Sequence, residues 1–99
     1  RIVNVSSECA VHAMCSDKAP AYRISKAALN AYTQVAAREV AGSGILVNAV
    51  CPGWTATALG GSGGRPAAES AEGVVWAALL PEREAATGEF FRDRVKIGW

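Results

Sequence analysis

The sequence predicts an α/β fold in which helices alternate with the strands of a parallel, doubly wound sheet. Residues 1–6 and 45–51 are short runs rich in β-branched and apolar residues, which is the pattern of buried strands. Residues 21–40, which lie between them, consist mainly of good helix formers. A strand, a helix and a second strand in this order form the right-handed crossover typical of parallel sheets. We therefore expect the order strand, helix, strand, helix, short strand.

The first expected strand ends at two adjacent serines. Ile2, Val3 and Val5 supply its β-branched side chains, and Ser6 and Ser7 follow. Open α/β sheets bind ligands at the carboxyl ends of their strands, so a hydroxyl here can face a site. Both serines could instead satisfy backbone groups at the strand end. The residues leave open which of the two hydroxyls points inward.

Residues 8–20 form an expected loop of mixed polarity, which can close one side of a pocket. Cys9, His12 and Cys15 lie in this loop at even spacing and raise the alternative of a small metal-binding module. A structural zinc normally takes four ligands, and a fourth could come only from a nearby carboxylate or a distant residue. The favoured interpretation is a loop with incidental thiols and no metal.

The expected helix of residues 21–40 carries a chemically meaningful pair. At 3.6 residues per turn, Tyr22 and Lys26 project side by side from one face. A free tyrosine has a pKa of about 10, and a nearby cation favours the phenolate. The pair is therefore a candidate for acid–base work, although the same spacing occurs on many solvated helices. Gly42 and Gly44 are typical of the end of such a helix.

The second expected strand, residues 45–51, is nearly continuous in apolar residues, and Pro52 ends it because proline cannot donate to a sheet ladder. A Pro-Gly turn follows, and then the glycine-rich residues 59–65. This segment does not join a strand directly to a helix, so it is not a phosphate-binding loop. It is expected to be a mobile lid over a pocket, or a disordered linker without a role.

The remaining residues predict a helix and a short strand. The helix begins at Pro66 or Ser70, with Ser70 as a candidate N-cap, and Pro81 stops it. Residues 88–91 are expected to form a short final strand, and residues 92–99 a mixed-charge tail.

Composition and charge indicate an ordinary globular chain. Of the 99 residues, 51% are hydrophobic and 19% are charged, and the net charge of +1 gives no field to attract nucleic acid or an acidic membrane. Cys9, Cys15 and Cys51 contain no CxxC motif and predict free thiols in a reducing compartment. No apolar run approaches the ~20 residues of a membrane span, and no leader pattern follows Arg1. We expect a cytoplasmic protein that binds neither nucleic acid nor membrane.

The strand ending in Ser-Ser, the Tyr-x-x-x-Lys helix and the strand ending in Pro-Gly together resemble the short-chain dehydrogenase/reductase family. Ser-Lys-Ala-Ala-Leu-Asn (25–30) and Val-Asn-Ala-Val-Cys-Pro-Gly-Trp (47–54) fit that family closely, and residues 76–81 and 87–93 are most similar to its carbonyl-reductase branch. The resemblance covers essentially residues 1–99. It identifies them as the C-terminal, catalytic half of a single Rossmann-like domain whose N-terminal dinucleotide-binding half is absent.

The resemblance implies hydride transfer between a nicotinamide dinucleotide and a carbonyl or alcohol. Ser7 would polarise the carbonyl, with Ser6 as the fallback, and Tyr22 would donate the proton. Lys26 would lower the pKa of Tyr22 and hydrogen-bond the nicotinamide ribose. The implied cofactor contacts are Tyr22, Lys26, Pro52, Gly53, Thr55 and Thr57. The carbonyl-reductase branch implies NADP, with NAD as the alternative.

The implied substrate is a small carbonyl compound. The alanines of residues 21–40 allow close approach of another helix, so this helix is the expected surface of a homo-oligomer. Two alternatives stay open, a non-catalytic dinucleotide-binding relative of the same family and the small metal-binding module. The 99 residues alone are expected to be inactive and to associate through the open edge of the first strand.

Overall fold

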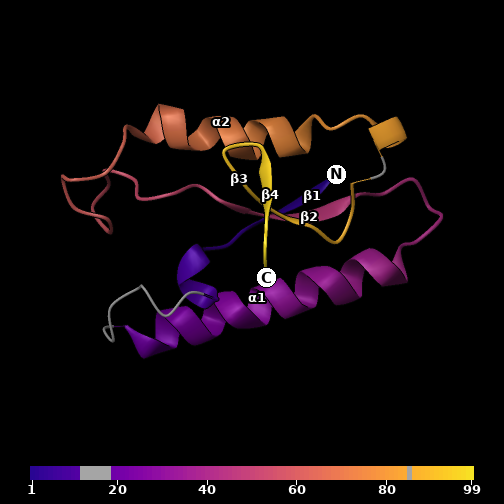
Figure 1. Cartoon of the computed structure of the whole chain (residues 1–99), viewed down its shortest axis with the longest axis horizontal. Coiled ribbons are helices and arrows are strands. Elements are labelled where there is room, and N and C mark those ends of the chain that lie inside the picture. Colours follow the sequence, from indigo (N-terminus) through magenta and orange to yellow (C-terminus); the bar gives the residue numbers. More distant parts are fainter. Residues whose placement is uncertain (12–18, 85) are drawn as a thin grey trace.

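A central sheet with a helix on each face makes up the chain (Figure 1). The computed structural model describes residues 1–11, 19–84 and 86–99. Its helices are α1 (Pro20–Glu39) and α2 (Ala67–Ala78), and two 3-10 turns, η1 (Glu8–Ala10) and η2 (Glu82–Glu84), lie in the connections. None of the helices in the described part of the chain combines the length and the apolar character that crossing a membrane requires.

The sheet is mostly parallel, as the sequence predicts. Its strands are β1 (Ile2–Val5), β2 (Val47–Cys51), β3 (Phe90–Arg92) and β4 (Val95–Ile97), and they lie side by side in that order. β1 and β2 are parallel with Val5 opposite Val50, and β2 and β3 are parallel with Ala49 opposite Phe90. The carboxyl ends of β1 and β2 therefore meet at one edge of the sheet, the edge at which such folds bind ligands.

β2 is the buried centre of the sheet. All five of its residues are buried, because α1 covers one face and α2 the other (Figure 1). The polar residue in the strand, Asn48, has partners for its amide: its Nδ2 donates to Ala86 O at 2.7 Å and its Oδ1 accepts from Glu89 N at 3.0 Å. The same side chain thereby fixes the chain that enters β3, and its burial carries no unpaired polar group.

Small residues bring α1 close to the sheet. Ala36 and Ala37 are buried against Val47, and the buried Thr33 Oγ1 accepts a hydrogen bond from Asn4 Nδ2 on β1 at 2.9 Å. On the other face, Ala77 of α2 packs with Val50 and Phe91, whose ring meets Trp76 edge-on at 5.1 Å between centroids. Both helices are thus fixed to the strands that carry the candidate site.

The start of α2 differs from one of the predictions. The helix begins at Ala67, after Pro66 in an extended conformation, and no side chain caps it. Ser70 is not the N-cap: it lies within the first turns, buried, with its Oγ 2.7 Å from Thr55 Oγ1. The Ser70 hydroxyl forms a hydrogen bond with Thr55, in the turn that follows β2, instead of capping the helix.

The expected tail of residues 92–99 is wrong in part, because β4 pairs antiparallel with β3. Asp93 and Arg94 form the two-residue connection and both have positive φ, 50° and 66°, as hairpin turns of this length require. Phe90 stacks on Trp99 with ring centroids 5.5 Å apart. The hairpin was not predicted from the sequence because its turn contains no glycine and its strands are only three residues long.

Candidate active site

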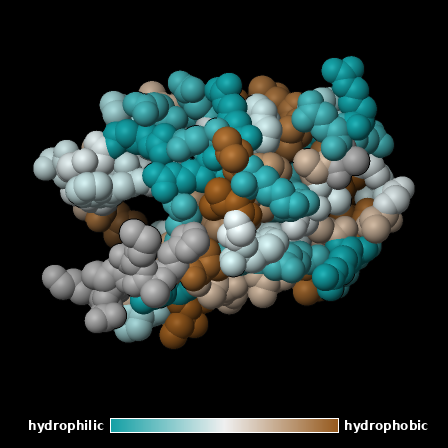
Figure 2. Space-filling view, in the orientation of Figure 1, coloured by the Kyte–Doolittle hydropathy of each residue, from teal (hydrophilic) through white to brown (hydrophobic). Residues whose placement is uncertain are grey.

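The candidate site residues line one cavity of about 860 Å³ at the carboxyl ends of β1 and β2. In Figure 2 the molecule is hollowed at its left end, beneath the pale lobe of the glycine-rich segment, and brown hydrophobic atoms lie at the rim. Among its lining residues are all of those predicted from the sequence: Ser6, Ser7, Tyr22, Lys26, Pro52, Gly53, Thr55 and Thr57. These residues are far apart in the sequence, but the end of β1, the start of α1 and the turn after β2 meet at one edge of the sheet.

The two serines at the end of β1 have different surroundings. Ser6 is 2% exposed, and its Oγ donates to Asn30 Oδ1 of α1 at 2.5 Å. Ser7 is half-buried and caps η1, where its Oγ accepts from Cys9 N at 3.2 Å. No acceptor for the Ser7 hydroxyl proton occurs among the described residues, so that proton is free to be donated into the cavity.

Tyr22 and Lys26 come from the first turns of α1 and lie together. The Lys26 Nζ is 5.7 Å from the centre of the Tyr22 ring, and it donates to Val5 O at the end of β1 at 2.7 Å. That bond uses one of the three ammonium protons and anchors the lysine beside the serine segment. Tyr22 keeps 39% of its surface exposed and is one of the residues that line the cavity.

The turn after β2 lines the cavity. Gly53 has φ of +75°, a conformation that favours glycine. The Thr55 hydroxyl is hydrogen-bonded to Ser70 of α2 at 2.7 Å, and Thr55 is one of the residues that line the cavity. The Thr57 Oγ1 accepts from Gly60 N at 3.0 Å and keeps a proton to donate.

The glycine-rich segment is not a disordered linker. Ala56 N donates to Arg65 O and Arg65 N donates to Trp54 O, both at 2.9 Å, so the loop closes on the turn from which it starts. The Trp54 indole also donates to Gly60 O at 2.7 Å. A Cβ on Gly64 would lie only 2.6 Å from the backbone of Trp54, so this close approach requires glycine. Movement of the segment as a lid remains a prediction.

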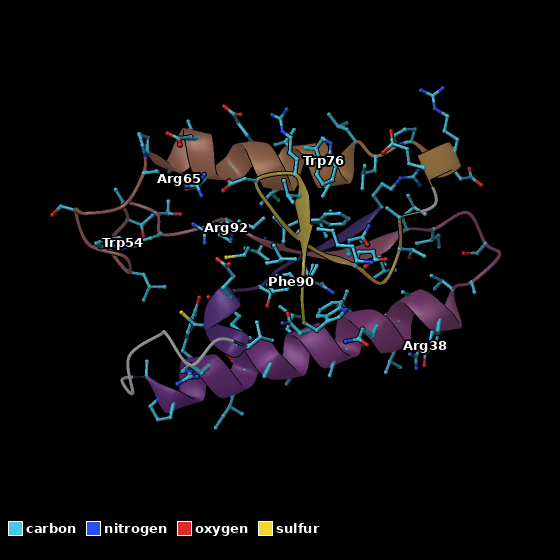
Figure 3. All side chains as sticks on the ribbon, in the orientation of Figure 1. Arg38, Trp54, Arg65, Trp76, Phe90 and Arg92 are labelled. Atoms are coloured by element: carbon cyan, nitrogen blue, oxygen red, sulfur yellow. The ribbon has the colours of Figure 1, made fainter. Side chains whose placement is uncertain are left out.

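Charged residues that the sequence did not single out surround the turn. The Arg65 guanidinium binds Asp93 through two hydrogen bonds, of 2.6 and 3.1 Å. Arg92, which lines the cavity, forms an ion pair with Glu8, the residue after Ser7. Figure 3 shows Arg65 near the start of α2 and Arg92 at the end of β3, with their side chains in the same region. No sequence signal joins these residues, which lie far apart in the chain.

The ion pair with Arg65 changes the titration of both partners. The hydrogen bond from Arg65 holds the pKa of Asp93 below its ordinary 3.8, and the same bond raises the pKa of Arg65. A carboxylate whose folded pKa is lowered stabilises the fold at pH values above its unfolded pKa, and that contribution disappears as the pH falls through the folded pKa. The pair is therefore intact at neutral pH.

The prediction of three free cysteines is wrong at Cys9, which is disulfide-bonded in the structure. Cys51 is free and buried, and its Sγ accepts from Glu8 N at 3.4 Å. Cys15 and His12 lie outside the described residues. A disulfide sulfur offers no thiolate to a metal, so the metal-binding module loses the ligand expected at Cys9. Within the described ranges, no group of three potential metal-binding side chains comes together.

Comparison with known proteins relates this geometry to a family. Residues 1–88 match a family model described as enoyl-(acyl carrier protein) reductase. Carbonyl reductase [NADPH] 1 of Bos taurus is 35% identical over 85 residues, which are 80% of this chain and 31% of that protein. The chain thus spans about a third of the length of this curated relative.

Solved structures agree with the sequence comparison. The carbonyl reductase Sniffer of D. melanogaster superposes with a TM-score of 0.80 and 28% identity, over 99% of this chain and 40% of that one. A short-chain dehydrogenase/reductase of Serratia marcescens gives a TM-score of 0.76 and 25% identity, over 93% of this chain and 43% of that one. The chain belongs to the short-chain dehydrogenase/reductase family.

Membership of the short-chain dehydrogenase/reductase family confirms two predictions made from the motifs. One is the family itself, with its carbonyl-reductase-like branch, and the other is the partial doubly wound sheet. The residues that carry the resemblance, Ser7, Tyr22, Lys26 and the turn of residues 53–57, are those that the fold brings to the cavity.

Proposed function

We propose that the protein is an NAD(P)-dependent carbonyl reductase that transfers hydride between a nicotinamide dinucleotide and a small carbonyl compound. The observation that carries the proposal is the single cavity lined by Ser7, Tyr22, Lys26 and the turn of residues 53–57. NADP is the proposed cofactor, because the Bos taurus relative is named for NADPH, and NAD is the alternative. A cytoplasmic location and a homo-oligomer formed through α1 stay predictions from the sequence.

Each side chain has a proton at the place its proposed role requires. Ser7 has accepted its hydrogen bond from Cys9 N, so its own proton can polarise a substrate carbonyl. Tyr22 lines the cavity and keeps 39% of its surface exposed, and its hydroxyl donates the proton that the developing alkoxide needs. Lys26 places its ammonium group beside the Tyr22 ring, 5.7 Å from the ring centre.

The donor set of the cavity fits a nicotinamide dinucleotide. Lys26 retains two ammonium protons after its bond to Val5 O, and these suit the hydroxyls of a ribose. Thr57 retains a hydroxyl proton for a phosphate or carboxamide oxygen, and Pro52, Gly53 and Thr55 supply the wall on which a flat ring can rest. When bound, the dinucleotide supplies the hydride, and the protein supplies orientation and electrostatics.

The test is Tyr22→Phe in the full-length protein, assayed with NADPH and a panel of carbonyl compounds. The change removes the proton donor and keeps the ring, so turnover should fall by about 10²–10⁴-fold while NADPH still binds. Tyr32→Phe is the matched control, because Tyr32 is an exposed tyrosine of the same helix that does not line the cavity. It should retain wild-type turnover.

Two outcomes would contradict the proposal. If Tyr22→Phe kept more than about a tenth of the wild-type turnover, Tyr22 would not be the general acid. A wild-type protein that binds NADPH but reduces no carbonyl compound of the panel would instead favour the non-catalytic, dinucleotide-binding relative.

A further inference from the structure

Five charged side chains of alternating sign form a continuous chain around the cavity. Glu8 pairs with Arg92, whose Nε lies 3.5 Å from Asp93 Oδ2. Asp93 binds Arg65 through both carboxylate oxygens, and an Arg65 nitrogen lies 3.8 Å from Glu69 of α2. The chain of ion pairs connects the segment after Ser7, the β3–β4 hairpin and the start of α2.

Arg65 occupies the space that a side chain at Gly53 would fill. An added Cβ on Gly53 would lie 2.3 Å from the Arg65 NH2 group and 3.0 Å from its Cζ. The guanidinium therefore lies directly on the backbone of the turn. The backbone of Arg65 also brackets this turn, because it accepts from Ala56 N and donates to Trp54 O. Arg65 thus contacts residues 53–56 through both its main chain and its side chain.

Asp93 holds the guanidinium in this position. Two hydrogen bonds in a parallel fork fix the plane of a guanidinium as well as its place, and Asp93 supplies both acceptors. The Arg65 side chain is 22% exposed and that of Asp93 is 55% exposed, so solvent screens the arginine less than its partner. Asp93 lies in the β3–β4 connection, where it and the following Arg94 both have positive φ.

We propose that Arg65 and Asp93 are positioning residues that hold the turn of residues 53–57 against the cavity. The pair fixes the backbone that the proposed function places beside the nicotinamide, and neither residue lines the cavity. The proposal depends on the proposed function only for what the turn binds, because the fixing of the turn is a property of the unliganded protein.

The first experiment measures amide hydrogen exchange of the peptide containing residues 53–57 in the full-length protein without ligand. Asp93→Asn keeps the size of the side chain and removes the charged fork. Exchange at these amides, of which Ala56 N is hydrogen-bonded to Arg65 O, should become about three- to tenfold faster. If Asp93→Asn fails to fold, Arg65→Lys, which keeps the charge and loses the fork, gives the same reading.

Glu72→Gln is the matched control. It removes the ion pair of Glu72 with Arg94, which joins the same hairpin to the same helix at 3.2 Å but lies away from the turn. Exchange of residues 53–57 should stay at the wild-type rate in this variant. Equal exchange in Asp93→Asn and Glu72→Gln would overturn the proposal, because the pair would then have no local effect on the turn.

The second experiment titrates the same variants with NADPH. The dissociation constant should rise about three- to tenfold in Asp93→Asn and stay unchanged in Glu72→Gln. Faster exchange with unaltered NADPH affinity would overturn the positioning role toward the cofactor. A wild-type protein that binds no dinucleotide would instead refute the proposed function, while the exchange data would still decide whether the pair fixes the turn.

Discussion

The two adjacent serines at the end of β1 have different roles because their side chains point in different directions. Both serines line the cavity, but the buried Ser6 donates its hydroxyl proton to Asn30 of α1, while the Ser7 hydroxyl proton is available. Side chains of consecutive residues in an extended chain point to opposite sides. One hydroxyl is therefore used for packing α1 onto the sheet, and the other is the candidate for chemistry.

At the residue scale, we predict that Gly53→Ala destabilises the protein more than Gly42→Ala does. Both glycines have φ near +80°, at +75° and +80°, so both variants should lose about 1 kcal/mol to backbone strain. Only at Gly53 does the new methyl group also displace the Arg65 guanidinium, because nothing lies within 4 Å at Gly42. Thermal melts of the two variants measure the difference, and equal melting temperatures would contradict the contact.

The β3–β4 hairpin is the element that completes the surroundings of the cavity. β4 is short, but its pairing with β3 fixes the connection that presents Asp93 to Arg65. Arg92, the last residue of β3, faces Glu8 on the other side. The hairpin thus joins two segments that line the cavity, although it supplies none of the residues predicted to carry the chemistry.

At the element scale, we predict that Arg94→Gly stabilises the hairpin relative to Arg94→Ala. Arg94 has φ of 66°, which costs a non-glycine residue about 1 kcal/mol, and glycine removes that cost. Both variants lose the exposed ion pair with Glu72, so this loss cancels in the comparison. Urea unfolding measures the two free energies of unfolding. A glycine variant no more stable than the alanine variant would contradict the strained turn.

Among the described strands, β1 lies at one edge of the sheet. Ile2 N donates to Leu46 O, just before β2, and Ser6 N donates to Val50 O of β2. In a parallel ladder the intervening Val3 and Val5 therefore direct their N–H groups away from β2. Ile2 and Val5 are 44% and 43% exposed. An edge with unpaired backbone groups and apolar side chains favours association with another strand.

At the scale of the whole molecule, we predict that the 99-residue chain produced by itself associates through β1 and binds no NADPH. Light scattering after size exclusion should give masses above the 10.3 kDa of one chain, and Ile2→Lys should lower them, because edge lysines oppose strand pairing. Val35→Lys on the exposed face of α1 is the comparison. If it dissociates the assembly and Ile2→Lys does not, association occurs through α1.

Local patterns in the sequence determined the order of the main elements and most of the candidate site. The apolar run of β2, the helix formers of α1 and the spacing of Tyr22 and Lys26 each depend on residues close in the chain. Such patterns can be recognised in the sequence without knowing the tertiary structure. The turn after β2 was predicted for the same reason, because Pro-Gly follows directly on a strand, whereas its place in the candidate site was implied by the resemblance to the family.

The tertiary structure alone decided the use of each serine, the β3–β4 hairpin and the charged residues around the turn. Arg65 and Asp93 are 28 positions apart, and Arg92 and Glu8 are 84 apart. Contacts of this range exist only after the strand order and the hairpin have formed, and an ion pair has no periodicity to mark it in the chain. Ser70 is a further example: the local sequence predicts that it caps a helix, but in the folded chain its hydroxyl is hydrogen-bonded to Thr55.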